Sequence, residues 1–140
     1  MNKDSKPTRF YSGGFLFNPQ TREVLLHKRD GNTENNPYKW AFFGGLNEGV
    51  ESAEEAFIRE MKEELNIDIA LDEVQKLCDY LNIERGTHRS IYFVESELDK
   101  SEMTLDEGED FEWIALDKVF EYDLTEKTVL DLRTFLSENK

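Results

Sequence analysis

The sequence predicts one domain of the α/β class, in which β-strands and two α-helices form layers around a shared core. Short apolar runs alternate with turn residues, two segments repeat apolar side chains at helical spacing, and 38% of the 140 residues are hydrophobic. A chain of this length usually forms one domain that buries a core of its own. We therefore expect a single domain over residues 9–140, preceded by a loose tail over residues 1–8.

The part of the chain before the first helix is predicted to be mostly β-structure. Pro19, Gln20 and Thr21 are turn residues between two apolar runs, which predicts a hairpin. A polar segment rich in Asn follows, and long loops of this kind are usually functional or mobile. In order, we expect strands at 8–18 and 23–29, the long loop at 30–39, a short buried strand at 40–43 and a glycine-bearing loop at 44–50.

A helix is predicted over residues 53–65. Ser52 followed by Glu55 forms the capping-box pattern that begins many helices. Asn66 stands just past the expected end, and Asn tolerates the left-handed conformation that closes a helix. The apolar side chains of one face recur every four residues, at Ala53, Phe57, Met61 and Leu65.

The rest of the chain predicts three more strands and a second helix. Two apolar runs are separated by the short turn Arg85-Gly86-Thr87, which favours a second hairpin. We expect strands at 76–84, 88–96 and 111–116, and a helix at 124–136.

Charge and composition exclude several classes of function. The net charge of −14 argues against bulk binding to nucleic acids or to anionic lipids. No apolar run is long enough to span a membrane, and the N-terminal residues lack the apolar segment of a signal peptide. The one cysteine, Cys78, excludes an internal disulfide and fits a reducing compartment, so we expect a cytoplasmic protein.

Three glutamates of the predicted helix, Glu60, Glu63 and Glu64, crowd one side of it. Like charges at this spacing destabilise a helix. At about 100° per residue, Glu60 and Glu64 border the apolar face rather than the solvated side. Arg59 and Lys62 lie at other angles and are not expected to neutralise all three. A divalent cation such as Mg²⁺, which prefers oxygen ligands, would offset this repulsion.

Residues 45–67, GLNEGVESAEEAFIREMKEELNI, resemble the signature of the Nudix hydrolases, G-x5-E-x7-R-E-U-x-E-E-x-G-U. Gly45, Glu51 and the Arg59-Glu60 pair occupy their positions in it, and Asn66 replaces the usual glycine. The resemblance implies a mixed, curved β-sheet between helices, with the signature forming a loop–helix–loop. It also implies Mg²⁺- or Mn²⁺-dependent hydrolysis of a nucleoside diphosphate linked to another group.

The resemblance further implies roles for individual residues. Glu60, Glu63 and Glu64 would bind the metal, together with the carbonyl of Gly44 or, as the lesser alternative, Gly45. Arg59 would orient these carboxylates through ion pairing, with Glu51 as its partner. The general base stays open between a glutamate of the signature, such as Glu63 or Glu60, and one from a later loop that includes Glu107, Glu109 and Glu112. There we favour Glu109, as an auxiliary ligand or base.

Weaker signals point to the substrate, which we expect to be a small nucleotide. Arg29, at the end of a strand, could hold a phosphate; Tyr38 could stack on a base, and Arg89 could reach an anion. Trp40 and Cys78 are expected to pack in the core. The substrate could be a nucleoside triphosphate or a nucleotide conjugate. The residues typical of ADP-ribose and dinucleoside polyphosphate hydrolases are missing, since no proline follows Pro37 and Glu84 replaces a tyrosine.

Two other classes of function stay open. One is a nucleotide-sensing Nudix domain without catalysis; such domains usually lose glutamates of the signature, and here all are present. The other is an acidic calcium-buffering module, in which Arg59 and the adjacent glycines would have no purpose. A homodimer is expected only by analogy, because dimers are common in the family.

Overall fold

The computed structural model describes residues 9–33, 36–106 and 108–138. The tail predicted for residues 1–8 and the candidate Glu107 lie outside these ranges. The strands are β1 (Phe10–Asn18), β2 (Glu23–Lys28), β3 (Trp40–Ala41), β4 (Phe43–Leu46), β5 (Gln75–Asn82), β6 (Thr87–Glu95) and β7 (Asp110–Ala115), and the helices are α1 (Ala53–Leu65) and α2 (Glu126–Glu138).

The strands pair in one mixed sheet with β1 at its centre. Strands β3, β2, β1, β6 and β5 follow one another across the sheet, and β1 and β6 are parallel. On its other side β1 changes partner along its length. Its first part, from Tyr11 to Gly14, pairs with β4, and its last part, from Leu16 to Asn18, pairs with β2. Strand β7 pairs with β2. Both predicted hairpins, β1–β2 and β5–β6, are confirmed.

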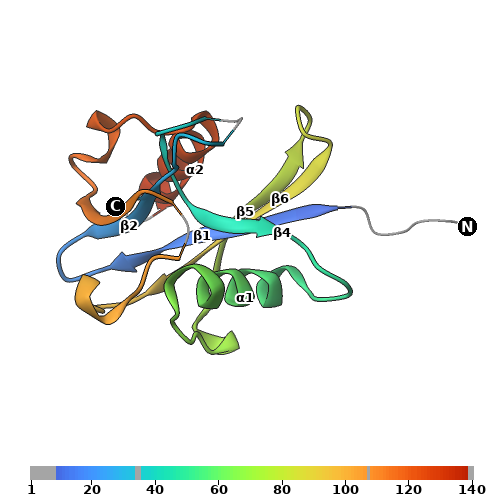
Figure 1. Ribbon diagram of the computed structural model, residues 1–140, viewed down its shortest axis with the longest axis horizontal. Coiled ribbons are helices and arrows are strands. Elements are labelled where there is room, and N and C mark those ends of the chain that lie inside the picture. The colour runs from blue at the N-terminus through green and yellow to red at the C-terminus, as the bar shows by residue number, and fades with distance from the viewer. Residues whose placement is uncertain (1–8, 34–35, 107, 139–140) are drawn as a thin grey trace, which may run out of the picture.

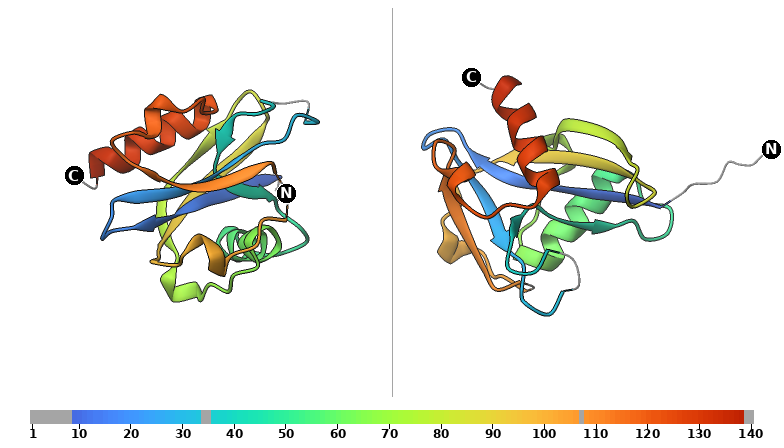
Figure 2. Two further views of the ribbon diagram at one scale, coloured as in Figure 1. Left: turned by 60° about the vertical axis from the view of Figure 1, so that its left-hand side comes forward. Right: turned by 90° about the horizontal axis from the view of Figure 1, so that it is seen from above.

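The two helices cover opposite faces of the sheet (Figures 1 and 2). Side chains of a strand alternate between faces, so neighbours on β1 enter different cores. Phe15 and Phe17 pack in one core with Phe135 of α2, whereas Leu16 packs in the other with Phe57 of α1. The predicted α/β class, with a mixed sheet between helices, is confirmed.

The local signals that predicted α1 are all present. The Ser52 hydroxyl accepts a hydrogen bond from the Glu55 N–H, and the Glu55 carboxylate accepts one from the Ser52 N–H. At the other end, Asn66 is left-handed, with φ 57°. The predicted bounds of 53–65 are therefore confirmed, because they depend only on neighbouring residues.

Three other assignments were predicted wrongly. Gly44, Gly45 and Leu46 belong to β4 rather than to a loop, because they pair with β1. The expected strand at 40–43 is interrupted at Phe42. The second helix begins at Glu126 rather than at residue 124, since the Thr125 hydroxyl accepts a hydrogen bond from the Thr128 N–H.

Neither helix described here has the length and apolar character needed to cross a membrane.

Packing of α1 on the sheet should contribute strongly to stability. Phe57 is fully buried between α1 and the sheet. We expect Phe57→Ala to lower the free energy of unfolding by about 3–5 kcal/mol in urea denaturation, because a large cavity is left. Lys62→Ala, at an exposed position of the same helix, should change it by less than about 0.5 kcal/mol. Similar effects of the two substitutions would show that the α1 core is not tightly packed.

Candidate active site

A small cavity of about 160 Å³ lies where α1 meets β2 and β4. It is lined by Glu64 of α1, Gly44 of β4 and His27 of β2. Arg29 follows β2, and Gly108 belongs to the segment before β7. Three segments far apart in the sequence therefore converge around one carboxylate.

Glu64 and Glu60 reach the two glycines of β4 directly. Glu64 is only 6% exposed, and its Oε2 accepts a hydrogen bond of 3.0 Å from the Gly44 N–H. A Cβ added to Gly45 would collide with the carboxylate of Glu60. A Cβ at Gly44 would collide with the β1 backbone at Ser12, and its φ of 155° also favours glycine. Gly45 therefore leaves room for the Glu60 carboxylate, and Gly44 lets β4 approach β1 closely.

The position of these carboxylates has an electrostatic cost. Burial is the main reason that the pKa of Glu60 is raised, and a hydrogen bond shared with Glu64 and the charge of Arg59 oppose that effect. Two carboxyl groups share a hydrogen bond only when one of them carries a proton. When both are ionised, the pair is a concentration of negative charge inside the protein, as the helical spacing indicated.

Arg59 is the main cation of the helix and reaches more carboxylates than expected. Its guanidinium lies 2.7 Å from Glu51, 3.1 Å from Glu60, 3.2 Å from Glu63 and 3.4 Å from Glu48. The predicted ion pair with Glu51 is thus confirmed, and the hydrogen bond to Arg59 lowers the pKa of Glu51. The long side chain of Arg59 also folds back over Glu60 and Glu63, two of the three carboxylates, which agrees with the expectation that it would not neutralise all three.

Glu63 is more exposed than Glu60 and Glu64. Its side chain is 53% exposed and pairs with Arg59. Within the described residues, no three His, Cys, Asp or Glu side chains converge in a ready-made metal cluster. The residues nevertheless fit a divalent cation. They offer hard carboxylate oxygens, with buried Glu64 and partly buried Glu60 close together and Glu63 on the same helix.

Glu109 lies beside the small cavity, next to Gly108. Its N–H donates to the Lys28 carbonyl, and its carboxylate lies 3.4 Å from the Lys28 ammonium. Glu112, the alternative, is on β7 and pairs with Lys100. Of these two candidates for a base from a later loop, only Glu109 adjoins a residue that lines this cavity.

His27 is a residue of the site that the sequence analysis missed. It is 8% exposed, its Nδ1 has no hydrogen-bond partner among the described residues, and that atom lies 3.8 Å from Oε1 of Glu64. Burial, with a smaller effect of the Arg29 charge, lowers the pKa of His27 to about 4. The alternation of side chains along β2 could have indicated its position, because His27 shares a face of the strand with Leu25, which packs in the α1 core.

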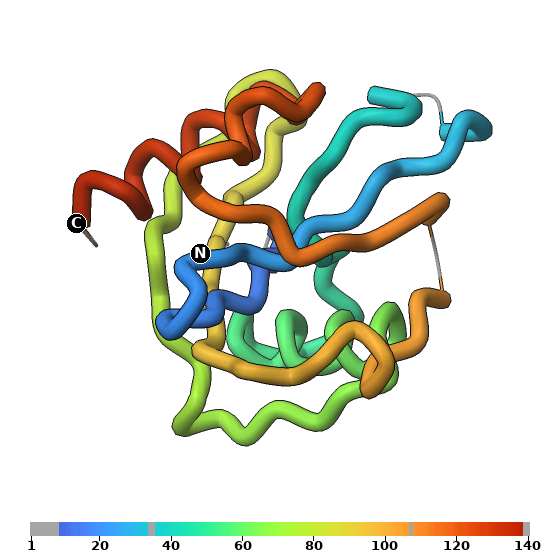
Figure 3. Tube along the Cα trace, turned by 90° about the vertical axis from the view of Figure 1, so that its left-hand side faces the viewer, coloured from blue at the N-terminus to red at the C-terminus, as the bar shows by residue number. Residues whose placement is uncertain are grey.

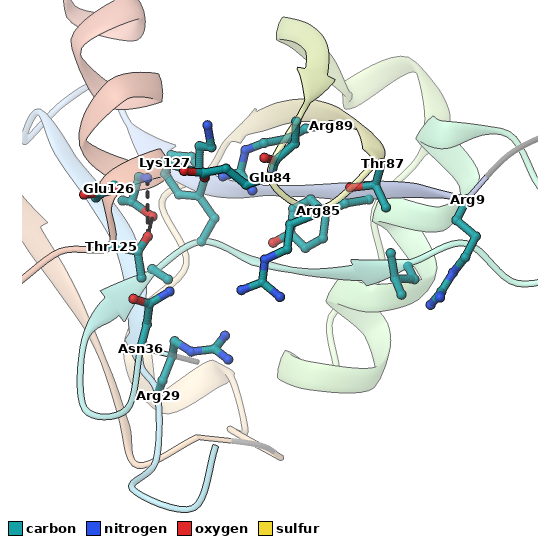
Figure 4. A pocket seen from close by; sticks show the side chains of 16 residues that line it. Arg9, Arg29, Asn36, Glu84, Arg85, Thr87, Arg89, Thr125, Glu126 and Lys127 are labelled. Atoms are coloured by element: carbon teal, nitrogen blue, oxygen red, sulfur yellow. Dashed lines mark hydrogen bonds between the residues drawn. The ribbon is translucent and has the colours of Figure 1, made fainter. Parts of the chain in front are cut away.

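A second cavity, of about 520 Å³, lies beside the first and shares Arg29 with it. Its walls come from the end of β2, the β5–β6 turn and the start of α2, which Figure 3 places at one end of the molecule. Figure 4 shows the side chains of Arg29 and Arg85 pointing into it from opposite sides. This volume lies in the range of small-molecule sites.

The predicted substrate residues differ in their placement. Arg29 lines both cavities, and Arg89 lines the larger one, although it is only 9% exposed. Tyr38 lines neither cavity; it is 53% exposed, with the Lys28 ammonium over its ring. Trp40 packs at the edge of the α2 core, as does Cys78.

Comparison with known proteins identifies the family. The profile of the NUDIX domain matches residues 7–137. The chain belongs to the NUDIX domain family. It is a pyrophosphohydrolase of the Nudix type, and Nudix hydrolases generally need a divalent metal ion. No curated protein matches the sequence.

Solved Nudix structures share the fold. A MutT NUDIX hydrolase from Burkholderia pseudomallei is 26% identical, with a TM-score of 0.69 over 92% of this chain and 98% of its own. A MutT from a study of Aliivibrio salmonicida and Vibrio cholerae has a TM-score of 0.76 at 21% identity, over 93% and 98% of the chains. The NUDIX domain of Shewanella oneidensis NrtR, solved with ADP ribose, has a TM-score of 0.73 at 16% identity, over 99% and 91%. At 21% and 16% identity, the last two likenesses concern the fold alone.

The burial of His27 gives a pH dependence of stability. Its pKa is about 4 in the folded protein against an ordinary 6.5, so below pH 6.5 the unfolded chain binds a proton that the folded protein does not. Stability that is present above pH 6.5 is therefore lost as the pH falls toward 4. Relative to His27→Gln, the wild type should lose about 3 kcal/mol of unfolding free energy between pH 7.5 and 4.

Urea denaturation at a series of pH values measures this loss. His88→Gln is the matched control, because it also removes one histidine from the unfolded chain but at a site that is 47% exposed. Parallel pH profiles for wild type and His27→Gln would contradict the burial of a neutral His27.

Proposed function

We propose that this protein hydrolyses the pyrophosphate bond of a nucleoside diphosphate joined to a further group, with Mg²⁺ or Mn²⁺ as cofactor. The observation that carries this proposal is the carboxylate pair of buried Glu64 and partly buried Glu60, which lies against Gly44 and Gly45. A buried pair of like charges costs stability, and a divalent cation offsets that cost. Arg59, which contacts Glu60, is shared among four carboxylates.

In this proposal Glu60, Glu63, Glu64 and the carbonyl of Gly44 hold the metal. A bound divalent cation neutralises negative charge on the pyrophosphate oxygens. Glu60 and Glu63 both contact Arg59 in this structure and would turn away from it to take part. Arg59 then keeps Glu51 as its partner, at 2.7 Å, and so positions the loop before α1 and the carboxylates that follow.

The reaction is a displacement at phosphorus. A water oxygen forms a bond to one phosphorus of the pyrophosphate, the bridging P–O bond breaks, and the proton of the water goes to a carboxylate. Glu109 and Glu63 are the two candidates for that base. Arg29 contacts the small cavity and supports the leaving or retained phosphate through charge-assisted hydrogen bonds.

The two adjoining cavities suit the two parts of such a substrate. The pyrophosphate lies in the small cavity near Glu64, and the larger cavity takes the nucleoside part, with Arg29 between them. Ala41, Phe42 and Leu46 give the larger cavity an apolar wall on which a sugar or base can pack. Nucleotide sensing without catalysis is the alternative, and the complete set of signature glutamates favours catalysis over it.

Substitution of the buried carboxylates should abolish turnover. We expect Glu64→Gln and Glu60→Gln each to lower kcat/KM by more than about a hundredfold on a panel of nucleotides, because each removes a charged ligand. Glu54→Gln, on the same helix but outside the site, serves as control. Near-normal turnover of Glu64→Gln at saturating Mg²⁺ would remove Glu64 from the metal site.

Metal binding should also be visible without catalysis. Because the ion binds only the folded state, millimolar Mg²⁺ or Mn²⁺ at fixed ionic strength should raise the Tm of the wild type. Glu60→Gln should be at least as stable as the metal-free wild type, since the like-charge repulsion is gone, but should gain little from metal. An unchanged Tm of the wild type in both ions would argue against the site.

A further inference from the structure

The larger cavity is positively charged in an otherwise acidic protein. Five of its lining side chains are cations and two, Glu84 and Glu126, are carboxylates. The cations are contributed by separate segments: Arg9, Arg29, Arg85, Arg89 and Lys127. The chain as a whole has a net charge of −14, so the charge of this cavity is opposite to that of its surroundings.

One of these cations, Arg89, is already neutralised by Asp131, a buried carboxylate outside the cavity lining. Arg89 donates through Nε to Oδ2 of Asp131 at 3.0 Å, and Asp131 is 1% exposed. Tyr80 donates to the other oxygen of Asp131 at 2.8 Å. The Asp131 carboxylate therefore fixes Arg89 in the cavity wall. With Asp131 counted, five cations face three carboxylates, which leaves an excess of two positive charges.

Arg85 and Arg29 are the cations best placed to hold a ligand. Arg85 belongs to the β5–β6 turn and Arg29 to the end of β2, and both point into the cavity (Figure 4). In the described residues, the Arg85 guanidinium has no carboxylate within ion-pair distance. Arg85 is exposed, and a phosphate on the ligand would supply the counter-charge that the described residues do not give it.

We propose that the larger cavity binds a phosphate monoester carried by the substrate in addition to the pyrophosphate that is cleaved. This inference rests on the proposed function, because it assigns the nucleoside part of the substrate to this cavity. A phosphate monoester has a charge of about −1.5 to −2 near pH 7, which matches the excess positive charge. One guanidinium group can also bind a phosphate through two hydrogen bonds at once. The preferred substrates are therefore nucleotides with a further phosphate on the ribose.

The scissile pyrophosphate does not explain this charge. It lies in the small cavity with the carboxylates, where Arg29 and the metal face it. Even with Arg29 assigned to the pyrophosphate, the remaining four cations outnumber the three carboxylates around the larger cavity.

Calorimetric titration without metal tests the cavity separately from catalysis. The probes are adenosine 5′-monophosphate, adenosine 2′,5′-bisphosphate and adenosine 3′,5′-bisphosphate, in EDTA at fixed ionic strength. At least one bisphosphate should bind about tenfold more tightly than the monophosphate, because charge-assisted hydrogen bonds contribute about that factor. Arg85→Gln should remove most of this advantage.

Arg133→Gln is the matched control, because it makes the same change in charge at a residue outside the cavity lining, over the Phe120 ring. It should leave the advantage intact. Equal affinities for the three nucleotides, no measurable binding, or equal loss in both variants would overturn the inference. Hydrolysis is assayed separately with metal. Hydrolysis without a bisphosphate preference refutes only this inference, and a preference without hydrolysis of any nucleotide refutes only the proposed function.

Discussion

The candidate site depends on the close contact between the carboxylates of α1 and the glycines of β4. Because Gly45 has no side chain, Glu60 can lie against β4, and Glu64 bonds to the backbone of the same strand at Gly44. Helix α1 is held at this distance by its own buried face, Phe57, Met61 and Leu65. The hydrophobic packing of the helix thus supplies the stability that offsets the burial of its charges.

The sequence predicted what depends on neighbouring residues and missed what depends on strand pairing. The bounds of α1 followed from a capping box and an αL Asn, which act within one turn. The assignment of Gly44 to a strand could not be derived this way, because only the pairing with Gly13 on β1 makes it a strand residue. His27 was missed for a related reason: it follows three apolar residues of β2, and its nearness to Glu64 arises from the packing of two distant segments.

The placement of the signature glutamates was predicted in part. Helical geometry placed Glu60 and Glu64 near the apolar face, and both are mostly buried. It did not predict that Arg59 would gather Glu63 and Glu60 together with Glu51 and Glu48, because side-chain rotamers are not determined by spacing. The family resemblance assigned roles to these residues, whereas the structure gives their contacts. Of the cations that line the larger cavity, the sequence indicated Arg29 and Arg89 but not Arg9, Arg85 or Lys127, since these residues come from segments that are not adjacent in the chain.

The change of partner along β1 has a consequence for how relatives of this protein can diverge. One part of β1 aligns the glycine strand β4, and the next part aligns β2, which holds His27 and leads to Arg29. The insertion of a single residue between Gly14 and Leu16 would shift these two pairings relative to each other and reverse the faces of one of them. Helices and loops elsewhere can gain or lose residues, but the length of this strand should stay constant over evolutionary time. Divergence of substrate preference should therefore be concentrated in the segments that wall the larger cavity.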